Sequence, residues 1–218
     1  MSGQLRFADS DAIEDLGTYV TRARTLDANG AIRLQSHGMA LTAYVGVLPG
    51  QGLMTTGAII GLRVIALAEP ADVDVTVSLA SVSDRLARGA TSVSSTPPAS
   101  TPTFSIPPTT VRVGWGALAP PRSGWEIVGD LSVEDLRAIA TQGIAEIAQG
   151  APEGSGAKAV ADLRARVWAR HSRTTPPIPS GAAFAAYALG FLTQESARVF
   201  AHGRWTRLST ATGHVLAR

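Results

Sequence analysis

Four blocks of alternating apolar residues between positions 31 and 77 constrain the fold more than any other part of the sequence. The blocks cover residues 32–36, 39–47, 58–67 and 73–77, and the last of them is the shortest. Alternation puts every second side chain on one face of a sheet, and this apolar face has to pack against another layer. We therefore predict that these blocks form the central sheet of the protein.

Helical patterns on both sides of this segment supply the expected covering layer. Asp11 followed by Glu14 resembles a capping box, and an apolar stripe then reaches residue 26. Ser132 with Asp135 marks the start of another helix, which should end near residue 148. Two further helices are expected at 156–170, where Ser155 would be the cap, and at 181–192.

The sequence predicts an α+β fold with a mainly antiparallel sheet and helices packed on it. Short strands at 197–201, 204–210 and 213–217 should form a β-meander after the C-terminal helices. Residues 90–110 are rich in Ser, Thr and Pro and are expected to be an exposed loop or linker. It would separate a helix and sheet unit at 1–89 from a helical unit with the meander at 111–218, the two packed as one globule. A returning strand is expected at 111–115.

A short pattern near the start of the chain recurs near its end, with one residue inserted. Two related helix-plus-hairpin units would explain the recurrence, and so would chance similarity between two amphipathic hairpins. The matched positions are Arg33, Leu34, Gly38 and Leu41 in the first copy and Arg207, Leu208, Gly213 and Leu216 in the second.

Composition favours a cytoplasmic protein. The chain has no cysteine, which excludes a disulfide framework, a thiolate metal site and a cysteine nucleophile. Residues 1–7 lack the basic and apolar regions of a signal peptide. The longest apolar window, 181–192, is too short to span a bilayer, so we expect no membrane partner.

Charge is distributed unevenly along the sequence. Residues 1–155 carry 10 basic and 15 acidic side chains, whereas residues 156–218 carry 9 basic and 2 acidic ones. The basic segment could face an anionic partner, or it could face the acidic part of its own chain. The net charge of +2 hides this asymmetry.

The sequence contains no complete motif of a known catalytic site. Ser155 and Lys158 match the S-x-x-K element of penicillin-recognising enzymes, but the companion elements are missing, and Ser155 is already explained as a helix cap. The histidines show no HExxH spacing, and no GxSxG, Walker A or Rossmann fingerprint is present. We therefore assign no catalytic residue, expect no cofactor, and lean towards a protein that is not an enzyme.

Five residues are candidates for binding a ligand or an anion. Arg122 and Trp125 share a Pro-rich turn that would present a cation beside an aromatic ring, although a Trp often folds back onto the core. Arg164 falls inside the apolar arc of the helix 156–170, where it must pair with an acid, extend to the edge or meet a bound anion. Arg204 and Arg207 belong to the predicted meander.

A cation site is conceivable at one strand. Asp72 and Asp74 flank Val73, so both carboxylates would point to the same face, and with Glu69 they could hold a metal ion. A solvated strand face explains the same spacing.

Three runs carry a resemblance to a known group of proteins. They are residues 41–50 (LTAYVGVLPG), 63–70 (RVIALAEP) and 204–210 (RWTRLST), and 18 of the 19 basic residues are Arg. Together they resemble a family of conserved hypothetical proteins from high-GC actinobacteria. The resemblance implies no activity and supplies no site residues.

Three classes of function remain. The leading hypothesis is a non-catalytic binding or regulatory protein, which would have a protein partner or form a homo-oligomer. The second is a nucleic-acid-binding protein that uses the Arg-rich C-terminal segment, in which helices precede an Arg-containing hairpin as in a winged helix. Against it, the helix 181–192 carries no Arg, Lys, Asn or Gln to contact bases or phosphates. The third is an enzyme whose site is assembled from distant loops.

Overall fold

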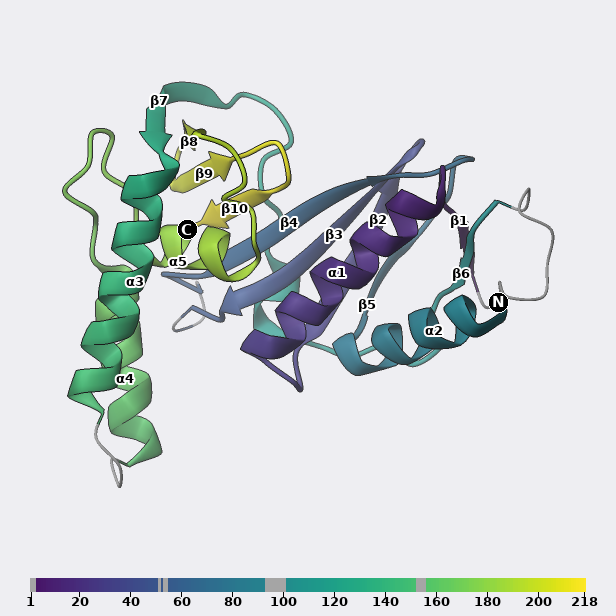
Figure 1. Ribbon diagram of the computed structural model, residues 1–218, viewed down its shortest axis with the longest axis horizontal. Helices are drawn as coiled ribbons and strands as arrows, with labels where there is room; N and C mark the ends of the chain where they lie inside the picture. The colour runs from purple at the N-terminus through teal and green to yellow at the C-terminus, as the bar shows by residue number, and fades with distance from the viewer. Residues whose placement is uncertain (1–2, 51, 53–54, 93–100, 152–155) are drawn as a thin grey trace. The chain divides into compact units, whose positions relative to one another are not determined.

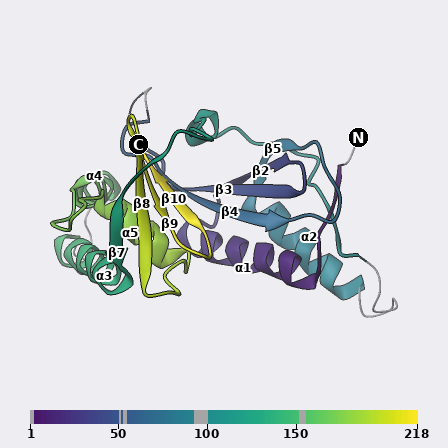
Figure 2. The same cartoon turned by 90° about the horizontal axis from the view of Figure 1, so that it is seen from above.

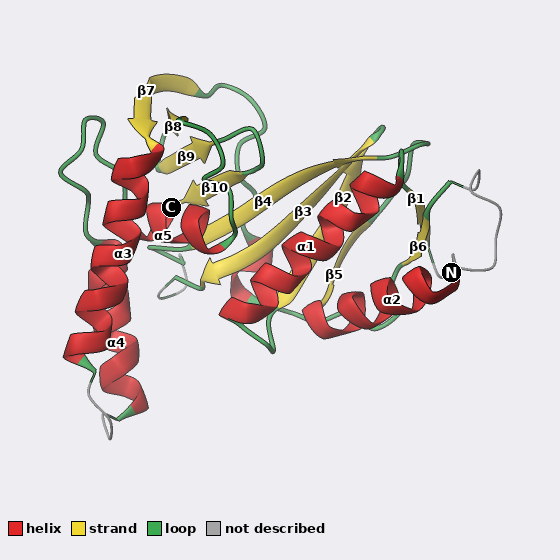
Figure 3. Ribbon diagram, in the orientation of Figure 1, coloured by secondary structure: helices red, strands yellow, loops and turns green. Residues whose placement is uncertain are grey.

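The computed structural model describes residues 3–50, 52, 55–92, 101–151 and 156–218 (Figure 1). Within these residues the predicted α+β class is confirmed, with five α-helices and a mainly antiparallel sheet (Figure 3). Eight strands form one sheet in the order β5-β2-β3-β4-β10-β9-β8-β7, and β1 pairs with β6 separately. The helices are α1 (Ser10–Leu26), α2 (Leu79–Ser92), α3 (Val133–Gly150), α4 (Ala157–Ala169) and α5 (Ser180–Ala188). The strands are β1 (Gln4–Arg6), β2 (Ala31–His37), β3 (Ala40–Leu48), β4 (Ile59–Ala66), β5 (Asp74–Ser78), β6 (Thr103–Ser105), β7 (Glu126–Ser132), β8 (Ser196–His202), β9 (Trp205–Ser209) and β10 (His214–Ala217).

The chain divides into two compact units. The first contains residues 1–47 and 62–117, and the second contains residues 48–61 and 118–218. Strand β4 therefore contributes its first three residues to the second unit and the remainder to the first.

In the first unit, α1 buries one apolar stripe against the strands. The buried residues of α1 include Leu16 and Val20, and those of the strands include Ile32 and Leu34. Helices α1 and α2 lie on the same side of β2 and β5 (Figure 2). The helix begins two residues earlier than the capping pattern predicts, because Asp9 is the N-cap and its Oδ1 accepts a hydrogen bond from the Ala12 amide at 2.8 Å.

The predicted hairpin between β2 and β3 is present. Its turn contains Gly38, whose φ of +58° favours glycine over residues with a side chain. Cross-strand pairs run without a shift from Ile32 opposite Val45 to His37 opposite Ala40. The alternating pattern of the sequence therefore predicted these strands to within one or two residues.

The segment after residue 100 departs from the expected loop. Phe104 on β6 is buried, and β6 pairs with β1. The prediction of a strand at 111–115 is wrong, because Gly114–Ala117 forms a short 3-10 helix (η2). This turn brings the Trp115 ring against Gly46, where an added Cβ would lie 2.3 Å from Trp115 Nε1.

In the second unit, three helices pack together beside the sheet. The predicted cap of α3 is confirmed, since Ser132 Oγ accepts a hydrogen bond from the Asp135 amide at 3.0 Å. The Trp168 ring of α4 stacks on Phe184 of α5, with ring centroids 4.4 Å apart. Among the described helices, none combines the length and the apolar character that a membrane crossing requires.

Helix α4 begins without a side-chain cap. Its N-cap is Gly156, which has no side chain to cap the helix. The expected cap, Ser155, lies outside the described residues. Helix α5 also ends before residue 192, at Ala188.

The predicted C-terminal meander is confirmed, and an additional strand precedes the helices. Strand β7 was not predicted, and its pairing with β8 contains an irregularity between Ile127 and Gly129. A helix followed by three consecutive strands occurs twice, as α1-β2-β3-β4 and as α3 to α5 followed by β8-β9-β10. The sequence recurrence is out of step with this repetition, since Arg33 lies on the first strand of its set and Arg207 on the second of its own.

Candidate functional site

Arg207 on β9 lies between two aromatic rings. Its guanidinium carbon Cζ is 4.2 Å from the centroid of the Phe200 ring and 4.6 Å from the centroid of the Trp125 ring. A cation within about 6 Å of the face of an aromatic ring is attracted by the ring quadrupole. Two cation–π contacts therefore hold the guanidinium in place.

Local structure explains how these three side chains meet. Phe200 on β8 is directly opposite Arg207 on β9, so the two residues project from the same face of the sheet. Trp125 ends the loop that precedes β7, and its Nε1 donates a hydrogen bond to the Pro121 carbonyl oxygen at 2.9 Å. This bond orients the indole ring.

Other aromatic and cationic residues extend the same face. His202 is directly opposite Trp205, and its ring centroid lies 5.8 Å from that of Trp125. The guanidinium carbon of Arg218 lies 5.6 Å from the Trp205 ring centroid. Buried Val199 and Leu208 alternate with these residues and point to the opposite face. We call this group the aromatic–cation face; it consists of the partly exposed residues Trp125, Phe200, His202, Arg207 and Arg218 and of Trp205, which is buried.

No carboxylate in the described part of the chain balances the charge of Arg207. Within the described residues the Arg207 side chain has no hydrogen-bond or ion-pair partner, and its Nε is buried. Burial lowers the pKa of the Arg207 guanidinium, because it removes water from the charged form. The N–H groups of a guanidinium donate in its own plane, and an oxyanion approaching in that plane would meet them.

The same face carries one acidic strand residue among those described. Asp130 on β7 is opposite Arg198 on β8, and Arg198 Nε donates to Asp130 Oδ1 at 2.9 Å. This carboxylate is already paired with a cation, which leaves the face positively charged.

The structure brings together some of the predicted ligand residues. Trp125 and Arg207 are in contact, which the sequence did not indicate. Arg204 is exposed at the turn between β8 and β9, and Arg122 is exposed in the loop before Trp125. Arg164 is exposed on α4 rather than held in an apolar arc.

Four members of the face were not predicted from the sequence. Phe200, His202, Trp205 and Arg218 were not singled out. A usable signal was present, because aromatic and basic residues alternate along both predicted strands and alternation places them on one face.

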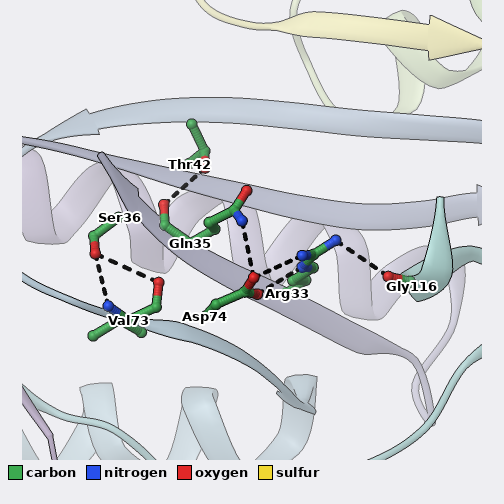
Figure 4. A network of polar contacts seen from close by, with 7 residues as sticks. All are labelled: Arg33, Gln35, Ser36, Thr42, Val73, Asp74 and Gly116. Carbon is green, nitrogen blue, oxygen red and sulfur yellow. Dashed lines mark hydrogen bonds and ion pairs between the residues drawn. The ribbon is translucent and has the colours of Figure 1, made fainter. Parts of the chain in front are cut away.

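Asp74 is engaged by an arginine in the first unit. Its Oδ1 accepts a hydrogen bond from Arg33 Nε at 2.8 Å, and its Oδ2 accepts from Arg33 Nη2 at 2.7 Å and from Gln35 Nε2 at 2.9 Å (Figure 4). These contacts lower the pKa of Asp74. Asp72 takes no part in this network, and Arg33 also donates to the Gly116 carbonyl oxygen at 3.2 Å. The part of the chain that the structure describes holds no group of three metal-ligating side chains.

A serine and a histidine also meet on the sheet. His214 Nδ1 lies 2.9 Å from Ser209 Oγ, and the two residues are directly opposite on β10 and β9. Polar side chains at directly opposite positions commonly form hydrogen bonds across paired strands. The two residues face each other across paired strands, so we assign this contact to strand pairing. Of the S-x-x-K pair, Lys158 forms an ion pair with Asp162 at 2.7 Å, and Ser155 lies outside the described residues.

Two family models match the chain, and each covers nearly half of it. Residues 1–105 match a domain of unknown function (DUF8010), and residues 120–218 match another domain of unknown function (DUF8185). No curated protein matches the sequence. The expected kinship with an actinobacterial family stays a prediction.

The fold is similar to that of bacterial DNA polymerase sliding clamps. The Caulobacter crescentus pol III beta structure is similar with a TM-score of 0.53 at 9% identity, over 100% of this chain and 65% of that chain. A second Caulobacter crescentus structure, a DNA polymerase sliding clamp, has a TM-score of 0.52 at 9% identity, and the match covers 100% of this chain and 65% of that chain. The DNA polymerase III subunit beta from Pseudomonas aeruginosa has a TM-score of 0.48 at 11% identity, with 100% and 64% covered. The chain thus spans less than two thirds of the length of these proteins, and the likeness concerns the fold alone.

Proposed function

We propose that this protein is a non-catalytic nucleic-acid-binding protein and that the aromatic–cation face is its contact surface. The observation that carries the proposal is Arg207, a partly buried cation that is held between Trp125 and Phe200 without a carboxylate partner among the described residues. A phosphate oxygen would complete the coordination of this guanidinium, because arginine forms its strongest hydrogen bonds with oxyanions.

The charge of the second unit supports a polyanionic ligand. Residues 48–61 and 118–218 contain 11 basic and 8 acidic residues. The first unit contains 8 basic and 9 acidic residues. Attraction to phosphates is long-ranged and depends on salt, so such a surface would speed association and weaken as salt rises. The Arg-rich C-terminal segment predicted from the sequence supplies most of this charge.

The comparisons support this proposal only through the fold. Proteins described as DNA polymerase sliding clamps share the arrangement of helices and strands, so a chain with this fold that acts on DNA would have precedent. A binding role is favoured over a catalytic one because the face offers cations and aromatic rings, which bind phosphates and bases. A cytoplasmic location is part of the proposal.

A second proposal, a protein partner or a second copy of the chain, rests on strand β7. It is the last strand in the sheet order, and its Ile127 and Val128 are 65% and 49% exposed. A terminal strand with exposed apolar side chains is a common contact surface. Sedimentation of the wild type and of Ile127→Lys would test it, and a monomeric wild type would argue against self-association.

Fluorescence anisotropy with labelled oligonucleotides at increasing salt tests the nucleic-acid proposal. Wild-type affinity should fall steadily as salt rises, and Arg207→Gln should reduce the salt dependence by about one phosphate contact. Arg166→Gln is the matched control, since Arg166 is exposed on α4 and outside the aromatic–cation face. Absence of salt-dependent binding, or an equal loss in both variants, would refute the proposal.

A further inference from the structure

The aromatic residues of β8 and β9 lie in two neighbouring cross-strand pairs. Phe200 is opposite Arg207, and His202 is opposite Trp205. Residues two apart on a strand are separated by about 7 Å, so the pairs lie side by side on one face. Trp125 joins them, because its ring contacts Arg207 and lies beside His202.

The rings and the cations suit different parts of a nucleic acid. Cations attract phosphates in single and double strands alike. Aromatic rings gain from stacking on the flat face of a base, and in a duplex those faces are covered by neighbouring base pairs. A sheet of several strands also presents a broad surface, whereas the major groove admits a helix or a two-stranded ribbon.

Phe200 and Trp125 are both partly exposed, so their rings are within reach of a ligand. Arg207 holds them apart, because its guanidinium contacts both. The cations Arg207 and Arg218 lie among the rings of this face, so phosphates could contact them while bases meet the rings.

We infer that the aromatic–cation face binds single-stranded nucleic acid in preference to duplex, with unpaired bases stacked on Phe200 and Trp125 and phosphates contacting Arg207 and Arg218. The inference rests on the proposed nucleic-acid function and names the form of the ligand.

Competition measures the preference directly. A labelled single strand bound to the full chain is displaced either by the same unlabelled strand or by that strand annealed to its complement. The single strand should compete at least about tenfold better, because each stacked base contributes a factor of about five to one hundred to the affinity.

Variants at Phe200 separate stacking from charge. Phe200→Leu keeps an apolar side chain and should weaken single-strand binding about tenfold while leaving duplex binding within about twofold. Phe200→Tyr keeps the ring and should restore single-strand affinity. Thermal unfolding of each variant shows whether the fold is retained, and Phe184→Leu is a control for loss of a ring elsewhere in the second unit.

The outcomes distinguish the two proposals. Equal competition by duplex and single strand would overturn the inference and leave the proposed function standing. Binding to neither would overturn the proposed function itself. Single-strand affinity unchanged in a folded Phe200→Leu would also overturn the inference, because the ring would then contribute nothing.

Discussion

Arg207 and Phe200 occupy directly opposite positions on β9 and β8, and the guanidinium carbon lies 4.2 Å from the ring centroid. The tight turn at Gly203, with a φ of +56°, sets this register. Strand pairing therefore places the cation over the Phe200 ring, and the Trp125 ring centroid lies 4.6 Å from the same guanidinium carbon.

A double-mutant cycle between Trp125 and Arg207 should show coupling. Trp125→Leu and Arg207→Gln each remove one partner of the cation–π contact, and the coupling energy should be about 1 kcal/mol in favour of the native pair. Urea unfolding of the four proteins measures it. The same cycle at Trp205 and Arg218 should give a smaller coupling energy, because the Arg218 guanidinium carbon lies 5.6 Å from the Trp205 ring centroid. Equal coupling energies in the two cycles would contradict this prediction.

Two glycines inside helices should respond oppositely to alanine. At Gly17 of α1 an added Cβ meets nothing within 4 Å, so Gly17→Ala should stabilise the protein by about 0.5–1 kcal/mol. At Gly143 of α3 the Cβ would lie 2.3 Å from Trp168 Cζ3, so Gly143→Ala should destabilise it by about 1–3 kcal/mol. Thermal unfolding checks both signs, and a stabilising Gly143→Ala would show that the Trp168 ring can move.

The Arg33–Asp74 pair should make stability depend on acid pH. The pKa of Asp74 is lowered in the folded protein by its hydrogen bonds with Arg33, so the pair contributes stability above the unfolded pKa of about 3.9. This contribution is lost as pH falls through the folded pKa. It should stay below about 1 kcal/mol, because the Asp74 side chain is 48% exposed.

Unfolding between neutral and strongly acid pH tests this linkage in Asp74→Asn. The variant should lose part of the acid dependence, and Asp72→Asn, which is absent from the network, should not. Identical pH profiles for the wild type and Asp74→Asn would refute it.

The cap of α3 should contribute measurably to stability. Ser132→Ala removes the acceptor for the Asp135 amide and should cost about 1 kcal/mol of unfolding free energy. Ser132→Thr keeps a hydroxyl and should recover most of the loss. Chemical denaturation measures both variants, and equal stability of Ser132→Ala and the wild type would show that water replaces the cap.

Local patterns predicted most of the secondary structure. Strand alternation located β2 to β5 and the final meander, and the Ser132 cap located α3, because these signals depend on residues close in sequence. The exceptions have tertiary causes. Trp115 lies in a strand-like sequence pattern but packs against Gly46. Phe104 lies in a Ser/Thr/Pro-rich segment but is buried on β6, which pairs with β1.

The candidate site was only partly predictable. Trp125 and Arg207 were each recognised as ligand candidates, but nothing in the sequence indicated that they touch. Phe200 and Arg207 are linked by a hairpin and could have been paired by counting from its turn.

By itself, the sequence determined the α+β class, the strand and helix periods, and the concentration of arginine near the C-terminus. These properties depend on composition and on neighbours along the chain. The tertiary structure alone decided that Trp125 lies over Arg207 and that the cation has no carboxylate partner within the described residues. Contacts between residues distant in sequence depend on how whole elements pack, and no local pattern encodes that packing.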